Sequence, residues 1–256
     1  ALGLEAVEIE CGAETRWALT PEALRRAHTE KPLDGVLVAS PANPTGTMYS
    51  PEALDALVRA ADDLGLWFIS DEIYHGLVYD GRQATALASS PRAIVINSFS
   101  KYYCMTGWRI GWMVMPEVLA KPIDRLAQNL TLSNNEISQR AALAAFDPVS
   151  TAELDVVKAG YAANRAYLLT HLPKLGFDDL LPVDGAFYAY ASVRRFSNDS
   201  LAFVRRMLAE AGVAATPGAD FDQARGAGFV RFSFAGTMAD MEEAVGRLGA
   251  WLPKIG

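Results

Sequence analysis

Short, dense apolar runs alternate with longer amphipathic segments through the first part of the chain. The runs Gly35–Ala39, Leu66–Ile69 and Ala93–Ile96 are typical of strands that are buried on both faces of a parallel sheet. The segments that separate them are longer and richer in charged residues, as expected for helices and loops that cover such a sheet.

Helix signals stand before and between these apolar runs. Ser50 and the proline after it predict the start of a helix that runs to about Leu64, and Gly65 predicts its end. Thr20 and the proline after it predict the start of an earlier helix. Strands and helices therefore alternate, which predicts an α/β fold with a mostly parallel sheet, flanking helices and right-handed crossovers.

Two further segments are predicted to be strands. Leu4–Glu10 alternates apolar and polar residues, as a short half-buried strand does. Trp108–Met115 is apolar and follows the central run closely. We therefore expect one strand before the first helix and one after the central strand.

The second half of the chain has a different pattern. It is helical from Pro116 onward, and Thr151–Leu175 is the longest helical stretch. Two short strands, Ala186–Ala191 and Phe229–Phe234, then stand on either side of a helix over roughly residues 200–211, and a last helix begins after Thr237. We predict a large domain over residues 1–150 and a smaller α+β domain over residues 151–256, with the boundary inside the long helix.

The composition argues against several classes of protein. A hydrophobic content of 51% is enough for a sizeable core. The formal net charge is −7 without a clustered basic run, which argues against nucleic-acid binding. No apolar stretch approaches the ~18 residues of a membrane span. The two cysteines, Cys11 and Cys104, suggest neither a disulfide framework nor a metal site. We expect a cytoplasmic protein that binds small molecules.

Polar residues follow three of the predicted strands at the point where each strand ends. Asn43 follows the first buried strand, Asp71 and Tyr74 follow the second, and the segment from Ser98 to Lys101 follows the third. Ligands of parallel α/β sheets bind at the carboxyl ends of the strands. We therefore expect these side chains to form one site.

The third of these segments contains a lysine and an arginine in apolar surroundings. Buried charges need partners, so an anion is expected near Lys101 and Arg109. The residues stand in the order Ser98-x-Ser100-Lys101, followed by Gly107-x-Arg109-x-Gly111. This order and spacing resemble the lysine motif of the class I and II aminotransferases, fold-type I enzymes that use pyridoxal 5'-phosphate. The resemblance extends over nearly the whole chain.

The resemblance implies a role for each of the polar residues. Lys101 would form a Schiff base with the cofactor and then move a proton between the substrate α-carbon and the cofactor. Asp71 would face the pyridine nitrogen and keep it protonated, so that the ring withdraws electrons. Asn43 and Tyr74 would donate hydrogen bonds to the phenolic oxygen of the cofactor.

The remaining predicted contacts are with anions. Ser98, Ser100 and Arg109 would bind the cofactor phosphate, the arginine through charge-assisted bonds. Arg231, flanked by apolar residues in a predicted strand, would hold the α-carboxylate of the substrate, and Asn43 would contact the substrate as well as the cofactor. The implied reaction is ping-pong transfer of an amino group between an L-α-amino acid and a 2-oxo acid.

Two other functions stay open on the sequence. Another fold-type I enzyme, of the carbon–sulfur β-lyase or aminocyclopropane-carboxylate synthase type, shares the lysine motif. The second is a regulatory domain that binds pyridoxal phosphate, or an inactive fragment, in which the residues of the site are present but no reaction is catalysed.

The family's large domain carries two further pieces upstream. One is a loop of glycine and small residues at a helix N-terminus that binds the phosphate, and the other is an aromatic ring that stacks on the pyridine. Neither is visible in this sequence. We therefore expect the chain to begin partway into the large domain and to bind pyridoxal phosphate weakly by itself. The resemblance implies a homodimer for the full-length protein.

Overall fold

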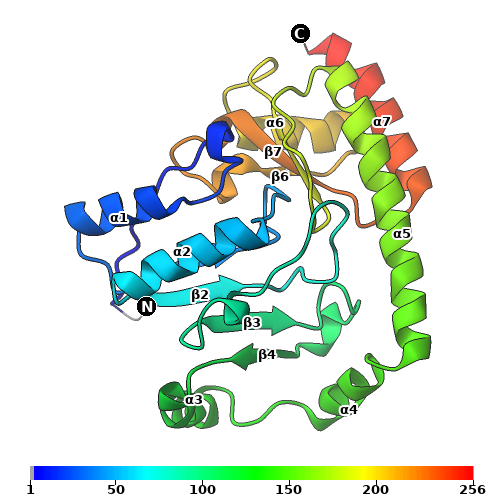
Figure 1. The fold of residues 1–256 in the computed structure, drawn as a ribbon. Coiled ribbons are helices and arrows are strands. Elements are labelled where there is room, and N and C mark those ends of the chain that lie inside the picture. Colours follow the sequence, from blue (N-terminus) through cyan, green and yellow to red (C-terminus); the bar gives the residue numbers. More distant parts are fainter. Residues whose placement is uncertain (1–2, 256) are drawn as a thin grey trace.

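The larger β-sheet of the protein contains four strands in the computed structural model, which describes residues 3–255 (Figure 1). In chain order and in spatial order they are β1 (Gly35–Ala39), β2 (Trp67–Asp71), β3 (Ile94–Ser98) and β4 (Gly111–Val114). The first three are parallel, and β4 is antiparallel to β3. The carboxyl ends of the three parallel strands therefore lie at one edge of the sheet.

Two helices pack against each other and against this sheet. They are α1 (Pro21–Glu30) and α2 (Pro51–Asp63), and each begins with proline after a hydroxyl residue that caps it. The hydroxyl of Thr20 accepts a hydrogen bond from the amide of Ala23, and Ser50 does the same for Ala53. The shared core contains Leu24, Val36, Val38, Leu54, Leu57, Val58, Phe68 and Val95.

Three helices follow β4: α3 (Glu117–Leu130), α4 (Glu136–Ala144) and α5 (Pro148–His171). α3 buries none of its residues. α5 extends from the end of α4 to the second sheet, where it packs beside α7 (Figure 1). Several large apolar side chains on these helices are exposed: Val118, Leu126, Leu130, Ile137, Leu143, Val149 and Val156.

The second sheet is antiparallel, with the order β5-β7-β6. Its strands are β5 (Tyr188–Ser192), β6 (Thr216–Pro217) and β7 (Phe229–Ser233). α6 (Ser200–Arg206) continues into a π-helical turn, Met207–Ala211, and α7 (Met238–Trp251) begins with a capping box. The core of this region contains Leu168, Phe177, Phe203, Val230, Phe232, Phe234 and Leu248.

Short 3-10 helical turns complete the regular structure. They are Ala13–Thr15, Ala86–Ala88, Thr106–Trp108, Pro173–Leu175, Gly218–Asp220, Gly226–Gly228 and Leu252–Lys254.

The predicted fold class is confirmed, with two differences in detail. The strand predicted over Leu4–Glu10 is wrong, because these residues lie in irregular, mostly exposed structure, and Leu4 is 84% exposed. Alternation predicts a strand only where another strand is available to pair with it. β4 is antiparallel because a short 3-10 turn, rather than a crossover helix, connects it to β3. The domain boundary inside the long helix stays a prediction.

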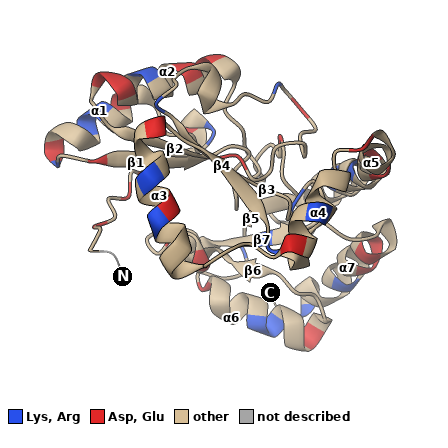
Figure 2. Cartoon of the chain, turned by 90° about the horizontal axis from the view of Figure 1, so that it is seen from below, with Lys and Arg blue, Asp and Glu red and all other residues tan. Residues whose placement is uncertain are grey.

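Charged side chains of both signs lie along the outer helices. Figure 2 shows basic and acidic residues interspersed on α1, α2 and α3. Between residues 3 and 255, no helix combines the length and the apolar content that spanning a bilayer requires.

Candidate active site

The ends of β2 and β3 bring Lys101 close to Tyr74. Lys101 lies in the loop after β3, and its Nζ is 5.5 Å from the centroid of the Tyr74 ring. The same atom is 5.8 Å from the centroid of the Phe187 ring, which stands just before β5. The amine therefore lies between aromatic rings from both parts of the chain.

Asp71 occupies the last position of β2. Its Oδ1 accepts a hydrogen bond of 3.1 Å from the amide of Ile73. Partial burial raises the pKa of the Asp71 carboxyl, and the Ile73 amide and the positive charge of Lys101 oppose this rise. The charge of Lys101 thus acts on Asp71, so the two side chains lie near each other.

Tyr74 is almost completely buried and contacts a second tyrosine. Its hydroxyl oxygen is 3.0 Å from that of Tyr188, at the start of β5. Burial raises the pKa of the Tyr74 phenol, and the hydrogen bond with Tyr188 adds to the rise. Tyr74 is therefore a neutral phenol in this environment.

Arg231 in β7 faces this group from the second sheet. Its Nη1 donates to Oδ1 of Asn43 at 2.6 Å, and its Nη2 donates to Oγ1 of Thr216 at 3.1 Å. The guanidinium carbon lies 4.1 Å from the ring centroid of Tyr188 and 4.7 Å from that of Phe221. The arginine is thus held between two aromatic rings.

The nitrogen Nε of Arg231 is buried and has no hydrogen-bond partner in the described part of the chain. A buried N–H group without a partner is rare in folded proteins.

The three residues predicted to bind phosphate lie in one loop. The Ser98 hydroxyl accepts a hydrogen bond from the Ser100 amide at 3.0 Å. Arg109 has left-handed backbone geometry, with φ of 52°, and its Nη1 donates to the carbonyl of Thr106. Thr106 in turn donates to the carbonyl of Ser100. Among the described residues, no hydrogen bond or ring contact connects Arg109 with Lys101 directly.

A buried acid stabilises the end of β2 behind the pocket. Oε1 of Glu72 accepts hydrogen bonds of 2.9 Å from the Ser70 hydroxyl and the Ala86 amide. Oε2 of Glu72 lies 3.4 Å from Nδ1 of His75. Burial lowers the pKa of His75, and the charge of Glu72 opposes this. His75 therefore has a local structural contact with Glu72.

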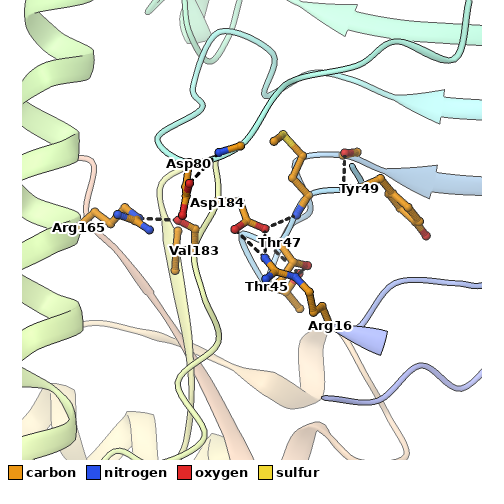
Figure 3. A network of polar contacts seen from close by, with 11 residues as sticks. Arg16, Thr45, Thr47, Tyr49, Asp80, Arg165, Val183 and Asp184 are labelled. Atoms are coloured by element: carbon orange, nitrogen blue, oxygen red, sulfur yellow. Dashed lines mark hydrogen bonds and ion pairs between the residues drawn. The ribbon is translucent and has the colours of Figure 1, made fainter. Parts of the chain in front are cut away.

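Asp184 connects the turn that carries Asn43 with the segment that enters β5 (Figure 3). Its carboxylate accepts hydrogen bonds from Nη2 of Arg16, at 2.6 and 2.7 Å, and from the amide of Met48, at 2.9 Å. Its own amide donates to the carbonyl of Gly46 at 2.8 Å. The position of Asn43 thus depends on contacts that join distant segments.

Sequence reasoning missed four residues of this site: Thr216, Phe221, Phe187 and Tyr188. All four lie in the second half of the chain, where the pattern predicted only strands and helices. The aromatic cluster in the segment from Phe187 to Tyr190 was the one available signal, and aromatic residues in strands are more often core residues.

The chain belongs to the aminotransferase class I and II family, because the sequence model of that family matches residues 1–248. This confirms the resemblance carried by the lysine motif. The enzymes of this family use pyridoxal 5'-phosphate, as the resemblance implied.

The individual relatives are aminotransferases as well. The valine–pyruvate aminotransferase of Mycobacterium tuberculosis is 53% identical over 255 residues, which are 99% of this chain and 65% of that protein. A crystal structure of an aminotransferase from the same organism has a TM-score of 0.95 at 52% identity, over 99% of this chain and 65% of the other. The aspartate/prephenate aminotransferase of Thermus thermophilus is 34% identical over 94% of this chain and 62% of its own length. The chain therefore spans somewhat less than two thirds of these relatives.

The donors of the site fit pyridoxal phosphate and an amino acid. Lys101, Arg109 and Arg231 form no ion pair within residues 3–255, and Arg109 is exposed, so the burial expected for it from the sequence is wrong. An aldehyde, a phosphate and a carboxylate are the matching groups for an amine and two guanidinium groups. The guanidinium of Arg231, which has no carboxylate partner among the described residues, is the observation that favours a bound anion most directly.

Proposed function

We propose that the protein containing this chain transfers amino groups between an L-α-amino acid and a 2-oxo acid, with pyridoxal phosphate as cofactor. The observation that carries this proposal is the position of Arg231, which is fixed by Asn43, Thr216 and two aromatic rings and has no carboxylate partner among the described residues. A series of contacts connects Arg231 with Lys101: Arg231 lies against Tyr188, Tyr188 contacts Tyr74, and Lys101 lies over the Tyr74 ring.

Lys101 is the proposed attachment point and proton carrier. The cofactor, when bound, supplies a ring that stabilises negative charge at the substrate α-carbon. The Lys101 amine takes the proton from that carbon and returns it during the exchange. Its contacts with the rings of Tyr74 and Phe187 hold the amine in place at the end of β3.

Asp71 and Asn43 have complementary proposed roles. Asp71 would hold a proton on the pyridine nitrogen, and the Ile73 amide orients its carboxylate for this. Asn43 uses its Oδ1 to accept from Arg231, so its Nδ2 group is left to donate to the phenolic oxygen of the cofactor. Tyr74 would donate to the same oxygen.

Ser98, Ser100 and Arg109 are the proposed phosphate ligands on this chain. The Ser98 hydroxyl is already engaged with the Ser100 amide, which fixes the shape of the loop. Arg109 uses Nη1 for the carbonyl of Thr106, and this contact leaves Nη2 and Nε to reach an anion.

A homodimer in the cytoplasm remains part of the proposal. The exposed apolar side chains of α3, α4 and the first half of α5 support self-association, because contiguous apolar surface marks interaction sites. Contact between two copies would cover Leu126, Leu130, Ile137 and Leu143.

The proposed reaction is tested with the natural protein that contains this chain. Incubation of L-amino acids with pyruvate or 2-oxoglutarate should yield the matching 2-oxo acid and new amino acid in equal amounts. Release of ammonia in their place would assign the site to a lyase and contradict the proposal. Lys101→Ala should abolish turnover, because no other amine of the described chain lies over Tyr74.

The carboxylate site is tested separately. Arg231→Ala should raise the KM for amino acids by about 10–100-fold, the effect of a lost charge-assisted hydrogen bond of ~1.5–3 kcal/mol. The cofactor absorbance should stay unchanged. Arg205→Ala is the matched control, because Arg205 is exposed on α6 of the same region. An equal rate with amines that lack a carboxylate would show that Arg231 does not bind this group.

A further inference from the structure

Tyr188 contacts both halves of the proposed site at once. Its hydroxyl oxygen is 3.0 Å from that of Tyr74, which lies under the Lys101 amine. Its ring centroid is 4.1 Å from the guanidinium carbon of Arg231. The residue is 7% exposed, so both contacts are shielded from solvent.

The register of the second sheet explains this position. Arg231 lies opposite Tyr190 and next to Thr216 in the antiparallel ladder. Tyr188 and Tyr190 are two positions apart in β5 and point to the same face. Arg231 is therefore a diagonal neighbour of Tyr188, within reach of a long side chain.

A tyrosine hydroxyl has one proton to donate, and this limits the Tyr74–Tyr188 contact. If Tyr188 donates to Tyr74, the proton of Tyr74 is free for another acceptor in the pocket. If Tyr74 donates to Tyr188, that proton is used. The direction of this single hydrogen bond therefore decides whether Tyr74 can donate to a ligand.

The charge of Arg231 favours the first arrangement. A guanidinium group over the face of a phenol is attracted to its electrons, and it makes the phenol a stronger hydrogen-bond donor. A carboxylate that binds Arg231 would reduce this effect. Tyr188 thus connects the charge at the carboxylate site with the donor state of Tyr74.

We infer that Tyr188 is a positioning residue that holds Arg231 by its ring and sets the hydrogen-bond direction of Tyr74 by its hydroxyl. The inference rests on the proposed transaminase function. Through these two contacts, binding of a carboxylate at Arg231 would change the hydrogen bond that Tyr74 donates to the cofactor.

The two contacts are separated by two substitutions. Tyr188→Phe keeps the ring beside Arg231 and removes the hydroxyl. We expect it to leave the KM for amino acids within about twofold of wild type and to lower kcat about tenfold, the effect of roughly one hydrogen bond. The pH midpoint of the visible absorbance of the cofactor-loaded protein should also shift.

Tyr188→Leu removes both contacts and should raise the KM about tenfold in addition. Phe221→Leu is the matched control, because Phe221 also lies against Arg231, and among the described residues the ring partners of Tyr74 are Phe187 and Tyr188. It should raise the KM and leave the pH midpoint of the absorbance unchanged. A purely structural role of Tyr188 predicts no such difference between the three variants.

The outcomes distinguish this inference from the function on which it rests. Absence of amino transfer in wild type would overturn the proposed function itself. Normal transfer in wild type, with Tyr188→Phe equal to wild type in both kcat and absorbance midpoint, would overturn only the inference. Thermal melting of Tyr188→Phe close to that of wild type shows that the changes do not come from unfolding.

Discussion

One residue of the proposed site, Asp71, lies in an environment that lowers the stability of the folded protein. Asp71 is partly buried, and this burial raises the pKa of its carboxyl. Its charged form is therefore less favourable in the folded protein than in the unfolded chain. In the proposed site, this carboxylate would keep a proton on the pyridine nitrogen at a cost in stability.

Asp71→Asn should separate these two properties. An acid whose folded pKa is raised binds more protons in the folded state, so its ionisation destabilises the fold as the pH rises above its unfolded pKa of about 3.9. The variant removes this effect and retains an oxygen for the Ile73 amide. We expect a higher free energy of unfolding at neutral pH for the cofactor-free protein, together with a lower kcat.

Urea unfolding at pH 4 and pH 7 measures this effect. The stability gain of Asp71→Asn over wild type should be larger at pH 7 than at pH 4. A variant that is less stable than wild type at pH 7 would contradict this account of the Asp71 environment.

At the scale of elements, the turn that carries Asn43 is fixed by segments far from it in the sequence. Asp184, which lies 136 positions after Met48, accepts the amide hydrogen bond of that residue. Arg16 reaches the same carboxylate from the segment before α1. The side chain of Arg16 is 55% exposed and that of Asp184 is 10% exposed, so the amide contact matters more than the screened ion pair.

Asp184→Ala should lower the melting temperature by about 4–8 °C. The variant leaves the Met48 amide without its acceptor, at a cost of about 2 kcal/mol, and 1 kcal/mol corresponds to about 2–4 °C in a chain of this size. It should also raise the KM for amino acids, because the Asn43 turn loses its support. Glu136→Ala is the control, because Glu136 is 75% exposed and its ion-pair partner Arg140 is 77% exposed; this variant should change the melting temperature by about 1 °C. Equal shifts in melting temperature for the two variants would show that the contacts of Asp184 stabilise the protein no more than an exposed ion pair does.

At the scale of the whole molecule, the two sheets contact each other through the site, and the helices after β4 are left with apolar faces. α3 buries no residue, and Leu130 and Leu143 are 78% and 73% exposed. Large exposed apolar side chains that recur over adjacent helices favour contact with another surface. The proposed second copy of the protein would cover them.

The double variant Leu130→Lys and Leu143→Lys should dissociate this dimer. Light scattering of the natural protein that contains this chain should give twice the mass of one copy, and the variant should give the mass of one copy. Leu208→Lys is the matched control, because Leu208 is 57% exposed but belongs to the π-helical turn after α6 and not to α3 or α4. A wild-type protein that has the mass of one copy at all concentrations would overturn the dimer.

The sequence by itself determined the elements and the lysine loop. Caps and helix ends depend on residues within one turn, so Thr20, Ser50 and Gly65 predicted helix bounds that the structure confirms. The apolar runs also predicted β1, β2 and β3, but the expectation that these strands are buried on both faces is wrong for β1, where Leu37 is 66% exposed. The motif from Ser98 to Gly111 was also recognisable from the sequence, because its residues lie close together along the chain.

Only the tertiary structure decided which distant residues meet. Asn43 contacts Arg231 across 188 positions, and Tyr74 contacts Tyr188 across 114 positions. No local pattern specifies such pairs, because they depend on how two separate sheets pack and on the register of β5 with β7. The same reason explains the strand wrongly predicted over Leu4–Glu10: an alternating pattern becomes a strand only when another strand supplies the hydrogen bonds.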